Sequence, residues 1–552
     1  MPSFPTCIKA LLGLLSCYCC FATVQAQDIG NLKKQKPYTL SGSIGASASF
    51  YNSNEPVATR PGLGWNIYGN LTPTIYGVSL PLSFVITQYS KSYTQPFTMF
   101  GLSPTYKWAK LHLGYRSISF SPVTFDGQSF RGVGLELNPR GFRFAAFYGK
   151  LNRKVNEDTS AGRFIQPQFS RIGYGIKIGV GNATNFFDLI YFHAKDDSTS
   201  AKVISKTGFR PQENTVLGSS FRFILAKKLV FSTDLAISGL KEDIAQPDSL
   251  KISDWAGQST LQLILKGYNT TLGYRRVAPD FKSLGTPYML NDVALVNWLN
   301  NFILSGGKLN ITTTLSSQHN NLDKRLATEM QTVVGNISAN AQLSQRVNLN
   351  INYSGYQLKQ KDGTLHLTDS VRMNQVIHQL SLVPSFTIAG GLNAHTISGN
   401  ICYMLLDDKN PVTTAYTSSN NLSTSINYTL GLAQKSMSFT LSGMYSRYNQ
   451  DTNSYRSYGT TIGSMVQLLK SKALSLQGSM GYMFNTSSFG SVQNNLTFSC
   501  NAGYHLKHHS LALYANYIYT PYNPINTIIN KQVAQAVASK NLAGGISYNY
   551  SF

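Results

Sequence analysis

The sequence is poor in cysteine and in charged residues. Of its 552 residues, 6 are Cys and 13% are charged. Four of the cysteines lie within the first 20 residues, which leaves Cys402 and Cys500 for the rest of the chain. Two such cysteines do not make a disulfide framework. Cys500 lies on an apolar face of its segment, and we expect it to act as a small hydrophobic residue.

Long apolar segments are almost absent as well. The one long run, residues 10–24, follows Lys9 and leads into Val24-Gln25-Ala26, an A-x-A-like cleavage site. We therefore predict a secretory signal peptide at residues 1–26 and a short periplasmic lead at 27–37. The alternatives are a transmembrane anchor, which needs about 20 apolar residues, and a lipoprotein site at Cys17. With no second run, the pattern does not fit a helical membrane protein.

Acidic residues are scarce relative to basic ones. The chain has 47 Lys and Arg against 24 Asp and Glu, a formal net charge of +23. Such an excess is typical of proteins that meet nucleic acid or anionic surfaces. We predict no nucleic-acid partner, because the basic residues are scattered, no nucleic-acid motif accompanies them and the chain is exported. Basic residues near the rim and the lumen of a membrane protein, where they meet anionic lipid or anionic solute, explain the charge better.

Aromatic residues are plentiful, at 12%, and the last stretch shows how they are used. In residues 541–552, apolar positions such as Leu542 and Ile546 alternate with polar ones. A period of two places the two sets on opposite faces of a strand. The stretch resembles the final strand of bacterial outer-membrane β-barrels, which ends in Phe and is recognised by the barrel-insertion machinery. The resemblance implies a membrane-insertion signal at Tyr548, Tyr550 and Phe552.

The same alternation continues along the chain from residue 38. Segments of about ten to fifteen residues, enough for a tilted bilayer crossing, are separated by breaks of two kinds. Short breaks such as Tyr76-Gly77 and Gly390-Gly391 alternate with longer polar ones such as residues 153–166 and 521–532. Short turns at one end and longer loops at the other are typical of an up-and-down membrane barrel. We predict an all-β fold: a single large transmembrane antiparallel β-barrel over residues 38–552, of about 26 strands and with no plug domain.

The charges predict which face of each strand looks inward. Ile172 and Tyr174 alternate with Arg171 and Lys177, so the charges share the polar face. A lipid-facing Arg or Lys would cost about 2–4 kcal/mol at the bilayer midplane, so the polar face should line the lumen. The inward-pointing charges could form a ladder whose field selects anionic or sugar-like solutes, or they could be structural salt bridges. The ladder residues are Arg116, Glu136, Arg171, Lys177, Asp188, Arg222, Asp234 and Arg275.

The second half of the predicted lumen has a different composition. There Asn, Ser and Thr dominate and ions are few, as in the segment Asn348, Asn350, Asn352 and Ser354. We therefore expect a wall whose charge is asymmetric.

The sequence offers no convincing chemistry for a reaction. Gly132-Val-Gly134 lies inside a strand with no helix after it, so it is not a dinucleotide site. The histidines at 505, 508 and 509 lack carboxylate or thiolate partners for a metal. The acidic pairs 196–197 and 407–408 lie at loop edges, where solvated acids are the simpler explanation than calcium. Ser and His occur without a local signature of a nucleophile. We predict no enzyme, no cofactor and no metal.

Several stretches resemble uncharacterised outer-membrane β-barrels of Bacteroidota. They are residues 101–108 (GLSPTYKW), 111–117 (LHLGYRS), 132–139 (GVGLELNP) and 273–285 (GYRRVAPDFKSLG). The similarity covers roughly the first half of the chain. It implies a barrel in the outer membrane of a Gram-negative bacterium, and it implies no particular substrate.

These observations predict a barrel that moves solute or polymer across the outer membrane. The alternative is a scaffold subunit of a secretion or surface-assembly complex that transports nothing. Barrels of about 16–18 strands already leave an aqueous channel, so a larger one needs something to fill it. The loops look too short to do so alone. We expect a flattened barrel, or a periplasmic or lipoprotein partner in the lumen, besides contact with outer-membrane lipid and the insertion machinery.

Overall fold

The computed structural model describes residues 36–54, 62–88, 99–157, 166–202, 209–246, 251–469, 471–488, 492–521, 528–529, 532–533 and 538–552. The predicted signal peptide at 1–26 lies outside the described residues, as does all of the 27–37 lead except Lys36 and Pro37. Within these ranges no helix has the length and apolar character needed to cross a membrane.

Nearly all of the described chain is strand. The N-terminal half contains β1 (Tyr38–Ser53), β2 (Leu63–Ile75), β3 (Val78–Ser79), β4 (Leu82–Thr87), β5 (Met99–Leu102), β6 (Thr105–Tyr106), β7 (Ala109–Ser117), β8 (Ser129–Leu137), β9 (Phe142–Asn152), β10 (Ser170–Gly181), β11 (Phe186–Asp197), β12 (Glu213–Leu225), β13 (Leu229–Lys241), β14 (Lys251–Leu265) and β15 (Tyr268–Val277). The C-terminal half contains β16 (Val293–Leu304), a 3-10 turn (Ser305–Gly307), β17 (Leu309–His319), β18 (Thr328–Gln342), β19 (Val347–Asp362), β20 (Asn374–Gly390), β21 (Asn393–Asp408), the short helix α2 (Thr414–Thr417), β22 (Ser419–Leu432), β23 (Met437–Gln450), β24 (Asn453–Leu468), β25 (Leu474–Ser487), β26 (Val492–Leu506), β27 (His509–Thr520), β28 (Ile528–Ile529), β29 (Gln532–Val533) and β30 (Ser539–Ser551).

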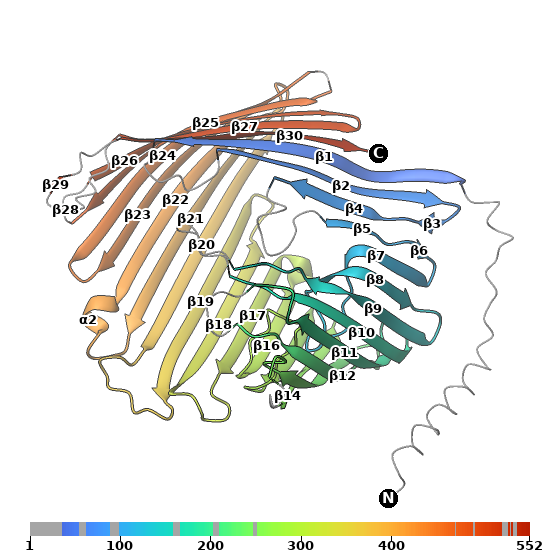
Figure 1. Cartoon of the computed structure of the whole chain (residues 1–552). Coiled ribbons are helices and arrows are strands. Elements are labelled where there is room, and N and C mark those ends of the chain that lie inside the picture. The colour runs from blue at the N-terminus through green and yellow to red at the C-terminus, as the bar shows by residue number, and fades with distance from the viewer. Residues whose placement is uncertain are drawn as a thin grey trace, which may run out of the picture.

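The main sheet closes on itself. Each strand pairs with its sequence neighbours in antiparallel fashion, and β1 pairs with both β2 and β30. Pro81 interrupts the strand formed by β3 and β4, and Pro104 interrupts the one formed by β5 and β6, because proline cannot donate a ladder hydrogen bond. The 28 hydrogen-bonded segments therefore make 26 strands, as the sequence predicted. Figure 1 shows the wall running from β1 around to β30 beside it.

The two ends of the barrel differ as predicted. At one end the connections are tight turns with left-handed residues, for example Tyr76 and Gly77 (φ 47° and 79°) and Ala226 and Lys227 (φ 49° and 57°). β1 begins and β30 ends at this end, where the Phe552 amide donates a 2.9 Å hydrogen bond to the Gly42 carbonyl. The longer loops lie at the other end. Short turns face the periplasm in barrels of this kind, so the loops face the outside.

The outer surface of the barrel is apolar. On β10 the outward residues Ile172, Ile176 and Val180 are 42%, 41% and 53% exposed. On β30 and at the residue after it, the outward set includes Ile546, Tyr548 and Phe552, which are 40–46% exposed. Water would make such an extended exposed apolar surface unfavourable. The predicted facing is therefore confirmed on these strands, with the apolar side outward.

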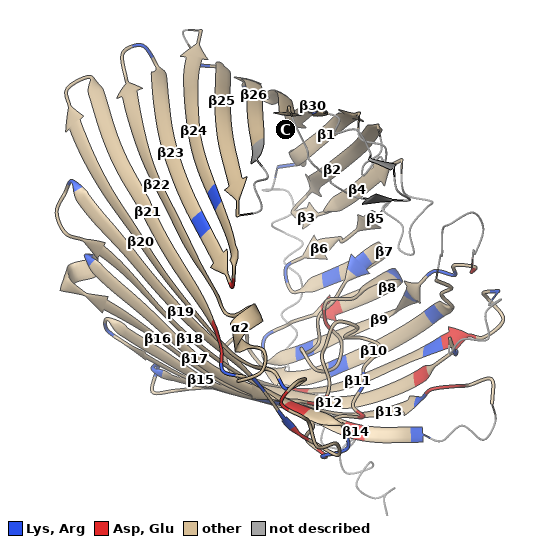
Figure 2. Ribbon diagram, turned by 90° about the vertical axis from the view of Figure 1, so that its left-hand side faces the viewer, with Lys and Arg blue, Asp and Glu red and all other residues tan. Residues whose placement is uncertain are grey.

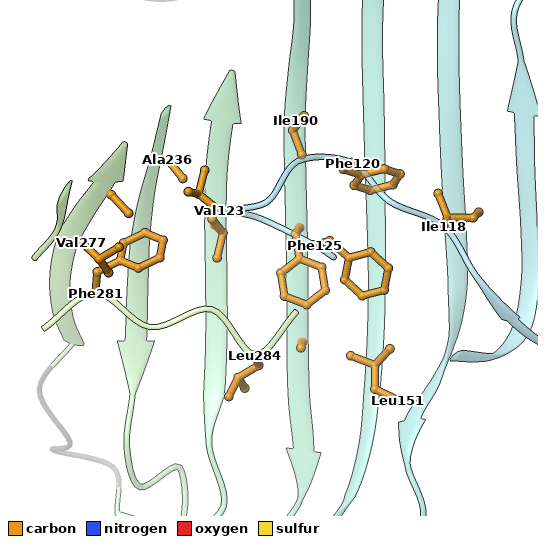
Figure 3. Packing of buried hydrophobic residues seen from close by; sticks show 14 of the residues in the cluster. Ile118, Phe120, Val123, Phe125, Leu151, Ile190, Ala236, Val277, Phe281 and Leu284 are labelled. Carbon is orange, nitrogen blue, oxygen red and sulfur yellow. The ribbon is translucent and has the colours of Figure 1, made fainter. Parts of the chain in front are cut away.

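The inner surface differs from the prediction on one side of the barrel. The sequence predicted a polar inner face throughout, but the inward side chains of β9, β11 and β12 include Phe147, Ile190, Phe192 and Val216, all buried. They are buried because residues 118–128 and 278–292, the loops that follow β7 and β15, fold into the barrel and pack on them (Figure 3). Loops that were expected to be too short to fill the lumen thus cover one part of its wall.

Candidate functional site on the inner wall

The infolded loops form a dry core against the β8–β15 side of the wall. Phe125, from the loop after β7, is 0% exposed and stacks on Phe147 with ring centroids 4.3 Å apart. Its ring also lies 5.2 Å from that of Phe192. From the loop after β15, Phe281 and Leu284 join the same cluster (Figure 3). Burial of this apolar surface, worth about 25 cal/mol per Å², holds both loops on the wall.

Polar contacts fix the position of the second loop. Asn214 of β12 is fully buried, and its Nδ2 donates to the Lys282 carbonyl at 3.0 Å. Its Oδ1 accepts from the Leu284 amide at 3.0 Å. Ser238 of β13 donates to the same Lys282 carbonyl. The backbone of this loop, which would otherwise be unsatisfied in a buried place, is thereby paired with the wall.

The two loops also bind each other across 159 residues of sequence. The Ser283 hydroxyl donates to the Thr124 carbonyl at 2.6 Å, and the Asp126 amide donates to the Gly285 carbonyl at 3.0 Å. A Cβ on Gly285 would lie 2.7 Å from both the Phe125 ring and the Thr124 carbonyl oxygen. The loops approach this closely because position 285 has no side chain.

Three of the eight charges predicted to form a ladder, Glu136, Arg171 and Asp188, have ion-pair partners within the wall. Arg171 makes two hydrogen bonds to Asp196, of 2.7 and 2.9 Å, between facing positions of β10 and β11. Asp188 accepts two from Arg143, at 2.8 and 2.9 Å. A carboxylate that accepts a two-pronged guanidinium contact has its charge neutralised locally. The pairs stiffen the wall, and little of their field is left for a solute.

Sequence reasoning missed Arg143, because its partner is not on a neighbouring strand. Arg143 of β9 and Asp188 of β11 are separated by β10, whose residue in the same row is Gly179. A Cβ at Gly179 would lie 1.9 Å from the Asp188 carboxylate oxygen. The ion pair therefore crosses the middle strand because that strand presents no side chain. An inward glycine between opposite charges is the signal that could have revealed it.

Arg116 and Glu136 are also bound into the wall. The Arg116 guanidinium donates to the Ser83 hydroxyl at 2.7 Å, to the Pro81 carbonyl at 3.0 Å and to the Gly101 carbonyl. It thus bridges the strands that the prolines interrupt. Glu136 accepts a 2.7 Å hydrogen bond from His112 Nε2 and lies 3.5 Å from Lys110 Nζ.

The remaining ladder residues lie on the same side of the wall. Lys177 lies under the first loop, with its Nζ 5.7 Å from the Phe120 ring centroid and 3.4 Å from the Ser119 carbonyl. Asp234 accepts from Gln258 at 3.0 Å, and Gln258 pairs in register with Arg275 on β15. In the described part of the chain no acid lies within ion-pair distance of Arg275 or Arg222. Arg116 and Lys177 likewise have no acid within that distance, so four cations of the ladder lack an ion-pair partner among the described residues.

The opposite side of the lumen is neutral, as the sequence predicted. One inward row runs through eight successive strands, β18 to β25, without an ionisable group other than a thiol, and none of its members is buried. The row consists of Ser338, Asn352, Ser381, Cys402, Ser423, Ser446, Ser457 and Asn485. The next inward positions toward the loop end on β23 and β24 are Tyr448 and Tyr455, whose ring centroids lie 6.2 Å apart. This wall can donate and accept hydrogen bonds but exerts little net field.

The groups considered for metal binding or catalysis have structural partners. His508 donates to the Ser551 carbonyl at 2.8 Å, and His509 lies 2.8 Å from the Tyr548 hydroxyl. Across the described ranges, no three His, Cys, Asp or Glu side chains gather as metal ligands do. The Ser103 hydroxyl lies 3.1 Å from His112 Nδ1, which links it to Glu136. However, Ser103 and His112 are 5% and 2% exposed, so a substrate has no access to them.

Comparison with known proteins adds little about function. No family model matches the sequence, and no curated protein matches it. The chain is similar to the translocation pore of the P pilus usher PapC at 12% identity, over 93% of this chain and 99% of that one, with a TM-score of 0.35. It is similar to OpdQ of Pseudomonas aeruginosa at 14% identity, over 58% of this chain and 93% of that one, with a TM-score of 0.35. It is also similar to OprD of the same organism at 13% identity, over 62% of this chain and 93% of that one, with a TM-score of 0.32. Likenesses this distant carry no functional conclusion.

The location of the chain follows from its own strands. A closed barrel leaves no unpaired edge, which is what a lipid environment demands of a β-structure. Its outer wall is apolar, and aromatic residues gather at the turn end, where the Tyr550 and Phe552 rings are 4.9 Å apart. The chain is therefore a β-barrel of the bacterial outer membrane. The role of Tyr548, Tyr550 and Phe552 as an insertion signal stays a prediction.

Proposed function

We propose that this outer-membrane barrel is a non-enzymatic channel for uncharged, hydrogen-bonding solute or polymer. The observation that carries the proposal is the asymmetry of the lumen. The two infolded loops cover the β8–β15 side, whereas the row from Ser338 to Asn485, which consists of hydroxyl and amide side chains and the thiol of Cys402, is not buried. A solute path along this neutral wall would exchange hydrogen bonds with water for hydrogen bonds with Ser and Asn, without an electrostatic barrier.

Several features support a path on this side. Two two-pronged ion pairs opposite it, Arg171 with Asp196 and Arg143 with Asp188, neutralise their charges locally and add little field. The Tyr448 and Tyr455 rings provide flat surfaces near the loop end, where a solute from outside would arrive. We infer that the preferred solutes are neutral and rich in hydroxyl groups. We do not propose that the charge ladder selects the solute.

Planar-bilayer recording of the purified full-length protein tests the proposal. Replacing Ser423 and Ser446 by Arg places two cations on the neutral row, and we expect the reversal potential in a salt gradient to shift toward anion selectivity. The matched control is the double variant Arg171→Gln/Asp196→Asn, which removes a paired charge of each sign and should leave selectivity unchanged. If wild-type protein passes no current and swells no liposomes with neutral oligosaccharide, the channel is refuted.

The second candidate function is a non-transporting scaffold in a secretion or surface-assembly complex. It is favoured by an apolar depression of about 850 Å³ on the outer wall of β23–β27, lined by side chains that include Phe439, Met480 and Phe498. An apolar segment of a partner would fit such a surface. A pull-down from native membranes in mild detergent decides for the scaffold if it yields a stoichiometric partner while the pure barrel conducts nothing. A partner seated in the lumen, a lipoprotein or a periplasmic protein, would appear in the same experiment.

A further inference from the structure

A row of basic residues crosses the outer surface near the loop end. Consecutive strand pairings place one residue of each strand from β7 to β14 side by side. The row consists of Tyr115, Arg131, Lys150, Ile172, Lys195, Glu213, Lys241 and Lys251. Five of the eight are cations and one is an acid. Neighbouring strands are about 4.8 Å apart, so the cations span roughly 29 Å from β8 to β14.

All members of this row point away from the lumen. Along each strand they have the same parity as outward apolar residues, for example Lys150 with Tyr148 and Lys241 with Ile237. Tyr148 and Ile237 are 57% and 62% exposed. Alternate residues of a strand share a face, so the cations and the lipid-facing side chains lie on one surface.

The row lies at the level of lipid headgroups. Lys241 is the last residue of β13 and Lys251 the first of β14, and Lys195 lies two residues before the end of β11. Toward the middle of the membrane the next outward residues include Tyr148 and Tyr174, the interfacial type of side chain. Figure 2 shows basic segments at the loop ends of β9, β11 and β14.

The charges of the row are poorly balanced by the protein. Glu213 is its one acid, and it lies 3.7 Å from Lys195 Nζ and 3.6 Å from His193 Nε2. Arg131 faces Lys150 across one strand pair, and Lys241 faces Lys251 across another. Like charges directly opposite each other destabilise a sheet. Anions seated between them would remove this repulsion.

We propose that this row binds the phosphate groups of a phosphorylated glycolipid in the outer leaflet. The surface is convex and continuous with the lipid-facing wall, so a lipid whose acyl chains pack on residues such as Ile237 brings its headgroup to Lys241 and Lys251. Guanidinium and ammonium groups are the usual partners of phosphate oxygens. The aliphatic part of the Lys251 side chain supports this geometry, because it lies against the backbone of Gly239. Its Cε lies 2.1 Å from the position that a Cβ on Gly239 would occupy. The site is independent of transport through the lumen.

Native mass spectrometry of the full chain in detergent tests the proposal, with thermal unfolding as a second readout. The probes are diphosphorylated lipid A, the same lipid without its phosphates, and inorganic phosphate. We expect lipid A to bind and to raise the unfolding temperature, and the dephosphorylated lipid to bind at least tenfold more weakly. In the variant Lys150→Gln/Lys241→Gln/Lys251→Gln, affinity for lipid A should fall at least tenfold.

The matched control is Lys227→Gln/Lys228→Gln/Lys266→Gln, which removes the same charge at the turn end and should bind lipid A as the wild type does. The triple Lys→Arg variant of the row should also retain binding. If the Gln variant does not fold, the single variant Lys241→Gln replaces it, with a threefold or greater loss expected. The proposal is overturned by equal binding of the dephosphorylated lipid, by inorganic phosphate binding as well as lipid A, or by undiminished binding to the folded Gln variant.

Discussion

The side-chain amide of Asn214 on β12 donates a 3.0 Å hydrogen bond to the carbonyl of Lys282, 68 residues further along the chain. One wall residue thereby holds a loop that connects two other strands inside the barrel. The contact is fully buried on the wall side. It explains why part of a polar-looking lumen is dry.

Replacing Asn214 by Ala should loosen the loop of residues 278–292. The amide of Leu284 would lose its buried partner, at a cost of about 1–3 kcal/mol, whereas the carbonyl of Lys282 would keep its hydrogen bond from Ser238. We expect a lower unfolding temperature in detergent and larger, noisier single-channel conductance. The matched control for the unfolding temperature is Asn352→Ala on the neutral wall, where no loop is attached. Equal effects of the two substitutions would contradict the conclusion that Asn214 holds the loop of residues 278–292 against the wall.

Replacing Gly285 by Ala should separate the two infolded loops. The new Cβ would meet the Thr124 carbonyl oxygen at 2.7 Å, a distance that real Cβ contacts do not show. Overpacking of this kind costs about 1–3 kcal/mol, measured as a shift of the urea midpoint. Gly335→Ala is the control, because a Cβ at that position meets nothing within 4 Å. A stable Gly285→Ala protein with unchanged Phe packing, as judged by near-UV circular dichroism, would disprove the close contact.

Replacing Asp188 by Asn should destabilise the barrel more than removing the whole ion pair. The side chain of Asp188 is 2% exposed and that of Arg143 is 17% exposed, so the single substitution leaves a buried guanidinium without its anion. Breaking a buried pair costs about 3–5 kcal/mol, whereas replacing both members with apolar residues can be nearly neutral. The measurement is urea unfolding in detergent of Asp188→Asn, together with a double-mutant cycle made of Arg143→Met, Asp188→Leu and the two combined. Additive losses would show that the two residues do not interact.

Replacing Phe552 by Ala should slow membrane insertion without changing the folded barrel. The ring contacts Tyr550 at the end of β30, and the backbone amide of residue 552 keeps its bond to Gly42 in the variant. We expect slower assembly into proteoliposomes that carry the insertion machinery, and unchanged spontaneous folding in detergent. Phe142→Ala, another outward aromatic at the turn end, 38% exposed, is the control. Equal assembly rates for Phe552→Ala and wild type would show that Phe552 is not part of an insertion signal.

Much of the fold could be predicted because it depends on short-range patterns. The alternation of Arg171 and Ile172 along β10 assigns each face, and turn residues such as Tyr76-Gly77 mark the hairpins. The candidate site was predictable only in part. Asp188, Asp234 and Arg275 were expected to face inward, and register places them in one row. The partner of Asp188 was not predicted, because Arg143 lies two strands away and reaches Asp188 over Gly179.

The sequence by itself determined that this chain forms an up-and-down outer-membrane barrel of 26 strands. The alternation of polar and apolar residues and the residue types at the hairpin turns are local properties, so both are visible in the sequence. Only the tertiary structure decided which loops enter the lumen. The burial of Phe125 and Phe281 cannot be read from their loop sequences, because it depends on inward side chains of β9, β11 and β15 that come together only in the folded wall. The register of successive strand pairs likewise placed Lys150, Lys195 and Lys251 in one outward row, from charges that look scattered along the chain.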